Sequence, residues 1–268
     1  MQQTSDTYKR IIQDDHWFET SVTIGDSGRL VDQYGDLILF GGDSILVDTG
    51  GPESGFREDK LFEGGVKTNS EFFRDGYPGA GYANAAYVDI TMVAPYNIPR
   101  KARISIYVRA VNSTEKSEWI PQGVYYIDTR EQTHDERGFD VLTVHGYDAM
   151  LLSEVTWPSS DSNDYPMLDK DMVQFIADHM KIDVDGSGVR VDPRTWDVMT
   201  AGYKFPLPVG YSMREVLCMI AAAYGANFII TQTGELRLVS MFDMPPETRN
   251  LITEDGYKIT FGGIYILV

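Results

Sequence analysis

The sequence contains a single cysteine, Cys218. One cysteine cannot form an intrachain disulfide, nor can it supply the several thiolates of a structural zinc site. The surrounding residues 217–223 are apolar, so we expect an inert thiol that packs against other side chains. Disulfides and thiolate-bound metals are therefore excluded as the basis of this fold, which must rest on packing and hydrogen bonds.

Long hydrophobic runs are also missing from the chain. No stretch approaches the roughly 20 apolar residues that a membrane-spanning helix requires. Residues 1–15 lack the apolar centre of a secretory signal peptide. We therefore expect a soluble protein that is made in a cytoplasm and does not insert into a membrane.

Basic residues are scarce relative to acidic ones. The chain has 23 lysines and arginines against 40 aspartates and glutamates, which gives a net charge of −17. A nucleic-acid-binding surface needs basic side chains to displace counterions from phosphates, and an anionic membrane surface attracts the same side chains. Both kinds of partner are therefore disfavoured. The simplest explanation of this charge is an ordinary acidic soluble protein. The more specific alternative is a surface that must not adhere to DNA.

Hydrophobic and aromatic residues, by contrast, are plentiful. They make up 43% of the 268 residues, which is enough to build one large β domain or two domains of ordinary size. In residues 103–109, the apolar Ile104, Ile106 and Val108 are expected to face a core and Arg109 to face solvent. Three segments show this alternation, which is typical of a sheet with one buried face: residues 17–24, 88–92 and 103–109.

A hairpin is expected near the centre of the chain. Residues 123–129 and 139–145 are rich in β-branched and aromatic side chains, and the polar stretch 131–138 separates them. We expect Gly146 to end the second strand and Asp148 to lie at the start of a short helix, where a carboxylate is favourable. Together with the alternating segments, this predicts five or six antiparallel strands before residue 146, enough for a sandwich or a small barrel.

Two longer helices are predicted in the second half of the chain. Asp169 is placed to cap a helix over residues 169–180. Ser212 and Glu215 form a capping box for a helix over residues 212–224, which Gly225 can end. A hairpin follows at residues 228–241. The sequence thus predicts a mainly β (α+β) protein, with antiparallel β-barrel- or sandwich-like modules and two capped α-helices in the C-terminal half.

The composition changes after residue 155. Residues 158–166 are polar and turn-forming, which is typical of a linker. We expect a first antiparallel β module over residues 1–155 and a helix-containing α+β module over residues 156–268. Residues 264–268 are an uncharged, strand-like run, and proteins normally cover such an edge. We therefore expect the chain to stop inside its natural fold.

The segment 50–86 is rich in glycine, proline and charge, and we predict one long loop with a short strand at residues 65–68. Loops of that length commonly serve binding or assembly. Its end, residues 77–87, is rich in tyrosine, which is enriched at interfaces. This end is therefore a candidate adhesive surface, or it simply covers the sheet. Before the loop, residues 36–47 predict a strand region interrupted by Gly41-Gly42.

Several short motifs resemble catalytic sites, and each lacks its partner. Asp48-Thr49-Gly50 follows an apolar run as in aspartic proteases, but it occurs once, so that paired carboxylates would require a dimer. Residues 25–28 and 42–44 mimic serine nucleophile loops, with no histidine placed to activate them. Strands that end in turns explain all three motifs more simply.

The motifs for metals and cofactors are equally incomplete. Residues 183–188 resemble the start of a calcium loop, but Arg194 stands where an EF-hand has its glutamate. Residues 79–84 form an imperfect dinucleotide fingerprint without the surrounding strand and helix. A hydrogen bond to the helix start at Asp148 accounts for one histidine without catalysis. The four histidines show no metal-ligand spacing: His16, His134, His145 and His179. We therefore expect no catalytic, cofactor-binding or metal-binding residues.

Two longer phrases carry a resemblance to a known family. The first joins residues 117–131 (SEWIPQGVYYIDTRE) to residues 141–154 (VLTVHGYDAMLLSE), and the second joins residues 211–217, 220–230 and 234–239. In order and spacing, both resemble the N-terminal part of the tail hub proteins of long-tailed bacteriophages and prophages. The likeness extends from residue 17 to residue 239. These phrases are structural and not catalytic signatures.

The resemblance implies a structural, non-enzymatic virion protein. Hubs of this family resemble a homotrimeric ring of β-barrel-like modules that closes the tail tube and connects it to tip or baseplate components. The implied partners are further copies of the chain and the tail tube, distal tail and tape-measure proteins, while DNA passes without specific binding. The implied location is the tail tip of the virion, after synthesis in the host bacterial cytoplasm.

Two other functions stay open at this point. A tail-associated peptidase or muramidase activity resembles an appended C-terminal domain in this family, and we expect no room for one in 268 residues. A carbohydrate-binding adhesin at the tail tip is the second alternative. An exposed aromatic cluster within residues 77–87 would favour the adhesin over the hub.

The incomplete motifs generate a direct prediction. Because Asp48 has no second carboxylate to share a proton with, Asp48→Asn should leave both thermal stability and any hydrolytic signal unchanged within error. Peptide and peptidoglycan cleavage assays on the purified protein and the variant check this. Cleavage by the unmodified protein that disappears in the variant would contradict the prediction.

Overall fold

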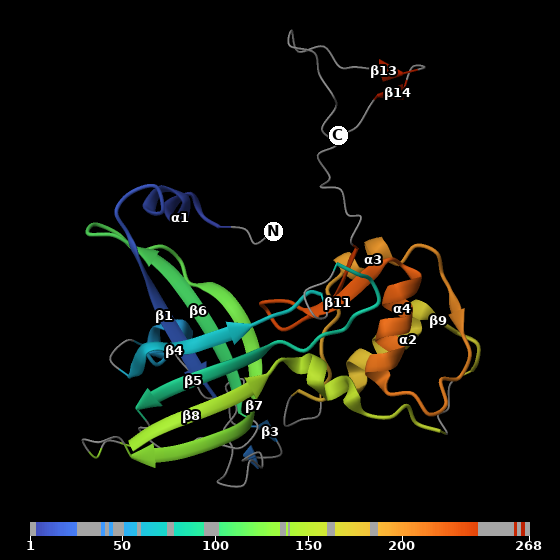
Figure 1. Cartoon of the computed structure of the whole chain (residues 1–268), viewed down its shortest axis with the longest axis horizontal. Coiled ribbons are helices and arrows are strands. Elements are labelled where there is room, and N and C mark those ends of the chain that lie inside the picture. The colour runs from blue at the N-terminus through green and yellow to red at the C-terminus, as the bar shows by residue number, and fades with distance from the viewer. Residues whose placement is uncertain are drawn as a thin grey trace.

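A computed structural model describes most of the chain. The described residues are 4–25, 51–57, 60–73, 78–93, 102–134, 138, 140–159, 164–182 and 187–240, with the short strand pairs 39–40 with 43–44 and 260–261 with 264–265. The expected mainly β architecture is confirmed: an antiparallel sheet curls into a half-barrel, and the longer helices lie together at one end of it (Figure 1).

The half-barrel is a six-stranded sheet in the order β1-β6-β7-β8-β5-β4. Every neighbouring pair is antiparallel. The predicted strands at residues 17–24, 88–92 and 103–109 are all present within it. The bounds are β1 (Trp17–Ile24), β4 (Leu61–Asn69), β5 (Tyr87–Val93), β6 (Arg103–Val111), β7 (Ile120–His134) and β8 (Asp140–Tyr147).

Alternation of apolar and polar residues gives the sheet one buried face. In β5 every second residue is buried, so that Val88, Ile90 and Met92 point inward. Hydrophobic burial on this inner face holds the strands together. The first core consists of Val22, Val88, Ile90, Met92, Ala102, Ile104, Ile106, Tyr125, Ile127, Leu142 and Val144, with Phe56, Leu61 and Val66 packed against them.

The predicted long loop at residues 50–86 is only partly a loop. It contains the short 3-10 helix η1 (Gly51–Ser54) and the nine-residue strand β4. Phe56 and Val22 of β1 exchange backbone hydrogen bonds of 2.8 and 2.9 Å, so this segment lies along the free side of β1. The sequence did not show the full strand because β4 is irregular. Its register against β5 shifts, and Gly64 has a φ of +64°.

The β7–β8 hairpin is longer than predicted. β7 continues through residues that we assigned to the connecting loop, since residues 131–134 still pair with β8. The prediction that Gly146 ends the second strand is wrong, because β8 runs on to Tyr147. A Cβ atom at Gly146 would lie 2.8 Å from the Tyr126 carbonyl oxygen. Gly146 therefore allows two strands to approach closely.

The remaining elements are short. None of the described helices is long and apolar enough to cross a membrane. The helices are α1 (Asp6–Ile11), η3 (Ala149–Glu154), α2 (Asp169–His179), α3 (Arg194–Val198) and α4 (Met213–Ala223). The paired strands are β2 (Leu39–Phe40) with β3 (Asp43–Ser44), β9 (Met167–Leu168) with β10 (Lys204–Phe205), β11 (Ala226–Ile230) with β12 (Leu236–Ser240), and β13 (Thr260–Phe261) with β14 (Ile264–Tyr265).

The caps of the two longer helices differ. The capping box of α4 is confirmed: Ser212 Oγ accepts from the Glu215 amide at 3.2 Å, and the Glu215 carboxylate accepts from the Ser212 amide at 2.7 Å. Gly225 follows with a φ of +60°. The cap predicted at Asp169 is wrong by one position, because Leu168 is the N-cap and makes no side-chain bond. The buried Asp169 carboxylate instead accepts from the Tyr203 amide and the Tyr224 hydroxyl.

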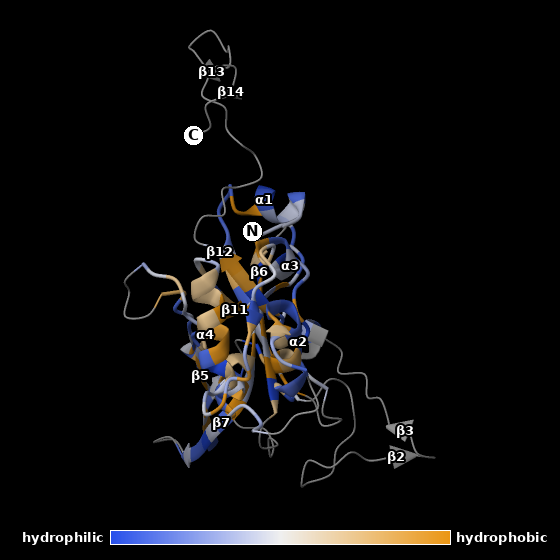
Figure 2. Cartoon of the chain, turned by 90° about the vertical axis from the view of Figure 1, so that its right-hand side faces the viewer, coloured by the Kyte–Doolittle hydropathy of each residue, from blue (hydrophilic) through white to orange (hydrophobic). Residues whose placement is uncertain are grey.

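A second core lies between the helices and the β11–β12 hairpin. Figure 2 shows hydrophobic residues gathered on α4 and β12. Both predicted modules contribute to this core, because Ala83 and Met150 lie in it beside residues from α2 and α4. The module boundary near residue 155 stays a prediction. The largest buried members are Phe228, Met150, Met172, Ile176, Met180, Met199 and Met213.

Residues 79–86, which we call the strap, join the two cores. The Gly81 amide donates to the Ala226 carbonyl at 2.9 Å, and the Phe228 amide donates to the Tyr82 carbonyl at 2.8 Å. Ala83 forms a parallel bridge with Phe228. Gly81 has a φ of +92°, and a Cβ atom there would lie 3.0 Å from the Ala222 Cβ of α4. The strap therefore acts as an extra strand beside β11, and its glycine allows it to lie against α4.

Asn227 completes the hydrogen bonds of the strap. Its side chain is 0% exposed. Its Oδ1 accepts from the Tyr82 amide at 2.9 Å, and its Nδ2 donates to the carbonyls of Gly79 at 2.9 Å and Phe72 at 3.3 Å. Buried backbone groups must be paired, and here one side chain pairs three of them.

Replacing this side chain should therefore weaken the whole fold. We expect Asn227→Ala to lower the free energy of unfolding by about 2–4 kcal/mol, because buried donors and acceptors lose their partner. Chemical denaturation measures this. Gln174→Ala on the exposed side of α2 is the control and should change stability by less than about 0.5 kcal/mol. Equal stability of the two variants would contradict the role given to Asn227.

Candidate functional site

Most of the catalytic-looking motifs lie at least partly outside the described residues. Asp48-Thr49-Gly50 and residues 26–28, 42 and 183–186 belong to this group. Asp43 and Ser44 form strand β3. The expectations for these motifs therefore stay predictions. The predicted interruption at Gly41-Gly42 also lies outside the described residues, between the two paired strands β2 and β3.

The four histidines have four separate partners. His145 was expected to bond the helix start at Asp148, but its Nδ1 lies 2.6 Å from Asp89 Oδ1 on the neighbouring strand. His134 pairs with Asp140 at 2.7 Å. Among the described residues, no group of three or more His, Cys, Asp or Glu side chains could hold a metal ion. The other two histidines contact backbone carbonyls, His16 that of Asp14 and His179 that of Phe175.

The imperfect dinucleotide fingerprint, residues 79–84, is part of the strap. Asn84 Nδ2 donates to the Glu71 carbonyl at 3.1 Å and so ties the strap to the end of β4. At the end of the tyrosine-rich segment, the ring of Tyr87 lies beside those of His145 and Tyr147, with centroids 5.6 and 6.4 Å away. The glycines of this motif therefore serve packing, and its asparagine fixes a turn.

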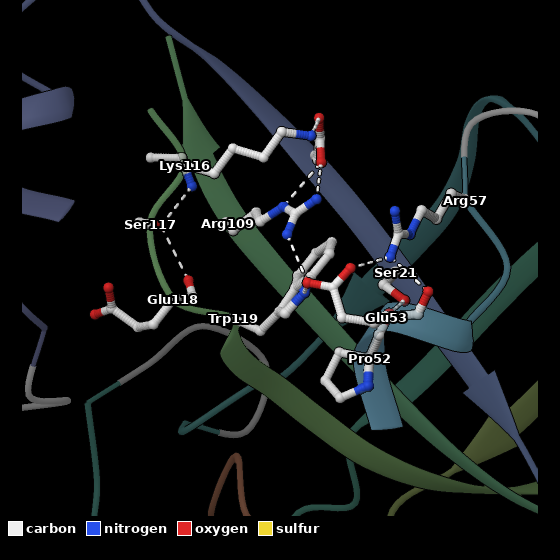
Figure 3. Close-up of polar contacts among 11 residues, drawn as sticks. Ser21, Pro52, Glu53, Arg57, Arg109, Lys116, Ser117, Glu118 and Trp119 are labelled. Carbon is white, nitrogen blue, oxygen red and sulfur yellow. Dashed lines mark hydrogen bonds and ion pairs between the residues drawn. The ribbon is translucent and has the colours of Figure 1, made fainter. Parts of the chain in front are cut away.

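The most extensive polar cluster surrounds Arg109. Its Nε and Nη2 donate to Glu19 Oε2 at 2.8 and 2.6 Å, and its Nη1 donates to Glu53 Oε1 at 2.8 Å. The guanidinium carbon lies 4.1 Å from the ring centroid of Trp119, a cation–π contact. Figure 3 shows Arg109 between Lys116, Trp119 and Glu53. The side chains come from β1, β6, η1 and the segment before β7.

The prediction that the Arg109 side chain faces solvent is wrong. It is only 6% exposed, since Trp119 covers it. Burial alone would raise the pKa of Glu19, but hydrogen bonds from Lys116 and Arg109 outweigh it and hold this pKa below its usual value. A hydrogen bond from the Trp119 indole is the first cause that lowers the pKa of Glu53. The cluster therefore keeps its carboxylates charged, and it fixes the position of β1.

The strand that this cluster fixes presents exposed aromatic residues. Trp17 and Phe18 begin β1 and are 50% and 48% exposed, and Ile12 follows α1 with 40% exposure. β1 is a terminal strand of the sheet order, and within the described part of the chain only Val22 pairs on its other side. Edge strands with exposed apolar side chains favour association with another chain. We name Ile12, Trp17 and Phe18 the β1 edge.

A second buried carboxylate lies where the sheet meets the helices. Asp148 is 5% exposed and is the N-cap of η3, as predicted, because its Oδ1 accepts from the Met150 amide at 2.9 Å. It also forms two bonds with Ala86: its amide donates to the Ala86 carbonyl at 2.9 Å, and its Oδ2 accepts from the Ala86 amide at 3.0 Å. Asp148 thus fixes the end of the strap to the start of η3.

Burial raises the pKa of Asp148 to about 7, despite the opposing effects of its two amide donors and of Arg214. Burial, followed by the charge of Asp148, raises the pKa of the nearby Tyr125 hydroxyl to about 12. Burial also raises the pKa of the Cys218 thiol, which fits the expected inert cysteine.

Comparison with known proteins finds only distant similarity. No protein-family profile and no curated protein matches the sequence. The 43 kDa tail protein of prophage MuSo2 from Shewanella oneidensis is 12% identical over 84% of this chain and 56% of its own, with a TM-score of 0.47. The tail protein from Neisseria meningitidis MC58 is 12% identical over 82% of this chain and 50% of its own, with a TM-score of 0.43. The chain spans about half the length of each. Similarities this remote do not establish a shared function.

The raised pKa of Asp148 predicts a pH dependence of stability. Its carboxyl binds a proton more tightly in the folded than in the unfolded chain, so its contribution is complete below the ordinary pKa of 3.8 and is lost as the pH rises through about 7. Relative to Asp148→Asn, the free energy of unfolding of the unmodified protein should fall by roughly 4 kcal/mol between pH 4 and pH 8. Denaturation of both proteins across this range tests it. A constant difference between them would contradict the raised pKa.

Proposed function

We propose that this chain is the N-terminal part of a tail hub protein of a bacteriophage or prophage. In this role it is a structural virion protein that closes the tail tube and connects it to tip or baseplate components. The support begins with the two family-like phrases. The first builds β7, β8 and η3, and the second builds α4 and the β11–β12 hairpin.

The observation that carries the proposal is the contact between these two phrases. Arg214 from the second forms an ion pair with Glu154 from the first. A Cβ atom at Gly234 would lie 3.3 Å from the Val124 Cβ atom. Thr156, just after the first phrase, forms a bridge with Ser212. Segments that resemble one family in sequence thus meet in space, as they must if they belong to one structural unit.

The shape and charge of the chain suit a ring around a passage. A curled antiparallel sheet is a module that can be arranged around an axis. Head-to-tail contacts between such modules form either a closed ring or an open filament, and the hub role requires the closed ring. A duplex carries a negative charge about every 1.7 Å of its axis, so a bore lined with basic residues would retain it. With a net charge of −17, the chain can line such a bore with acidic or neutral side chains. DNA then passes without binding.

The β1 edge is our candidate for the contact with a neighbouring copy. Trp17 and Phe18 are exposed on the two faces of β1, Ile12 is exposed just after α1, and the Arg109 cluster holds β1 in one position. An edge strand that is already held in position loses little conformational entropy on association. The tail tube, distal tail and tape-measure proteins are the other proposed partners, and the virion tail tip is the proposed location. A structural role is preferred to hydrolysis because the carboxylates and histidines described above bond strands, caps and neighbouring side chains to one another.

Electron microscopy of particles formed by the full-length protein tests this function. We expect closed rings of three copies, and the double variant Trp17→Glu, Phe18→Glu should reduce the ring fraction at least about tenfold, since two charges would then have to be buried at the contact. Tyr211→Glu, at an exposed aromatic residue outside the β1 edge, is the control and should leave the rings intact.

Two outcomes would contradict the proposal. A closed dimer without a central passage would exclude a hub. A ring whose passage retains DNA at moderate salt would exclude free passage of the genome. Rings that persist in the double variant would leave the hub role standing and reject only the contact at the β1 edge.

A further inference from the structure

A surface pocket of about 410 Å³ lies where the sheet meets the helices. Its wall combines the end of β4, the strap, the start of β5, the end of β8, η3 and the first turn of α4. Ligand pockets measure about 300–1,000 Å³, so this one is at the small end of that range. It is lined chiefly by Asn69, Asn84, Tyr87, Tyr147, Leu151 and Arg214.

Two tyrosine rings form a rigid wall of this pocket. The ring centroids of Tyr87 and Tyr147 are 6.4 Å apart, and each ring contacts His145, at 5.6 and 4.8 Å. Asn69 Nδ2 donates to the Tyr87 hydroxyl oxygen at 3.1 Å. Both rings are half-buried, and the contacts with His145 and Asn69 restrain them. Fixed aromatic faces of this kind suit the apolar face of a flat ring.

Polar groups with free capacity surround these rings. The Tyr87 hydroxyl accepts from Asn69 and keeps its own proton to donate. Asn84 uses Nδ2 to bond the Glu71 carbonyl, which leaves its Oδ1 as an acceptor. Within the described part of the chain, the Asn69 Oδ1 and the Tyr147 hydroxyl have no hydrogen-bond partner. Donors and acceptors are therefore both present, as hydroxyl groups of a ligand require.

The charge of the pocket disfavours ions. Arg214 is its only cation among the lining residues, and its guanidinium is already bonded to the Ala83 carbonyl and the Glu154 carboxylate. Glu71 adds a carboxylate to the wall. An anionic ligand would meet this carboxylate and an arginine that is already neutralised, and a cation would meet a single exposed carboxylate with little else to hold it. A neutral ligand encounters neither penalty.

We propose that this pocket binds a neutral pyranose unit of a carbohydrate. The apolar face of the sugar ring lies against Tyr87 or Tyr147, and its hydroxyl groups bond the carboxamides of Asn69 and Asn84. This site goes beyond the proposed hub role, which requires no small ligand. It also differs from the adhesive segment expected at residues 77–87, because Tyr147 and Asn69 come from other parts of the chain.

The test is direct binding to the full chain by saturation-transfer NMR and calorimetry. The probes are the methyl glycosides of glucose and galactose and N-acetylglucosamine, with longer neutral oligosaccharides to distinguish a polymer from a free sugar. Glucuronate and a sugar phosphate are the charged comparators. We expect at least one neutral probe to bind with a dissociation constant of about 1 mM or below.

Two variants and a matched control assign the binding to this pocket. Tyr147→Leu removes an aromatic face while keeping bulk, and Asn69→Ala removes a carboxamide. Each should weaken binding of the neutral probe on the order of tenfold. Tyr211→Leu makes the same exchange at an exposed tyrosine outside the pocket and should leave the affinity unchanged. Circular dichroism and thermal unfolding establish that all three are folded.

The proposal is overturned if no neutral probe binds, if the charged comparators bind more tightly, or if both pocket variants retain full affinity. These results are independent of the ring test. A hub without sugar binding still forms rings, and a sugar-binding chain that forms none would contradict only the hub.

Discussion

The hydrogen bonds between the strap and β11 are the constraint on which the rest of the structure depends. The strap leaves the sheet, crosses to the helices and pairs with Ala226 and Phe228 before the chain returns as β5. The buried Asn227 side chain bonds two further backbone groups of the strap, the Tyr82 amide and the Gly79 carbonyl. At the other end, Asp148 bonds Ala86 in both directions. Without these pairs, partly buried peptide groups of the strap would lose their hydrogen-bond partners.

Two carboxylates at different places in the fold respond to pH in opposite ways. Glu19 has a lowered pKa, so its stabilising contribution is present above the ordinary value and is lost as the pH falls. Asp148 has a raised pKa, so its contribution is lost as the pH rises through about 7. A rise in pH therefore removes the contribution of Asp148, and a fall in pH removes that of Glu19. The first holds the edge strand of the sheet, and the second holds the junction to the helices.

Much of the sheet could be predicted from the sequence. Alternation in residues 17–24, 88–92 and 103–109 identifies strands because the pleat places successive side chains on opposite faces. The capping box at Ser212 and Glu215 identifies α4 because its partners are local. Both signals need only neighbours along the chain, and both are confirmed.

The errors arise where distant residues decide the outcome. The alternating pattern predicts that Arg109 faces solvent, but Glu19 lies directly opposite it in the sheet register and Trp119 covers it. Gly146 reads as a strand end, but Tyr126 approaches it within the sheet. Asp169 reads as a cap, but Tyr203 and Tyr224 engage its carboxylate. Strand register could have revealed the Glu19–Arg109 pair, and it is not visible in a single sequence.

The pocket beside Tyr87 and Tyr147 and the β1 edge could not be predicted from the sequence for the same reason. Tyr87 and Tyr147 are distant in sequence and become neighbours only through the pairing of β5 with β8. Trp17 and Phe18 read as the start of an ordinary strand, and only the strand order places them at an edge. Both proposed sites therefore depend on contacts between residues that are distant in the sequence.

The central claim is that the strap couples the sheet and the helical core into one unit. Native-state hydrogen exchange measures this coupling most directly, by comparing the slowest amides of β6 and β8 with those of α4 and β11. The account predicts that both groups exchange with the same opening free energy and are destabilised together by denaturant. Exchange of α4 and β11 through an opening that leaves the sheet fully protected would contradict it.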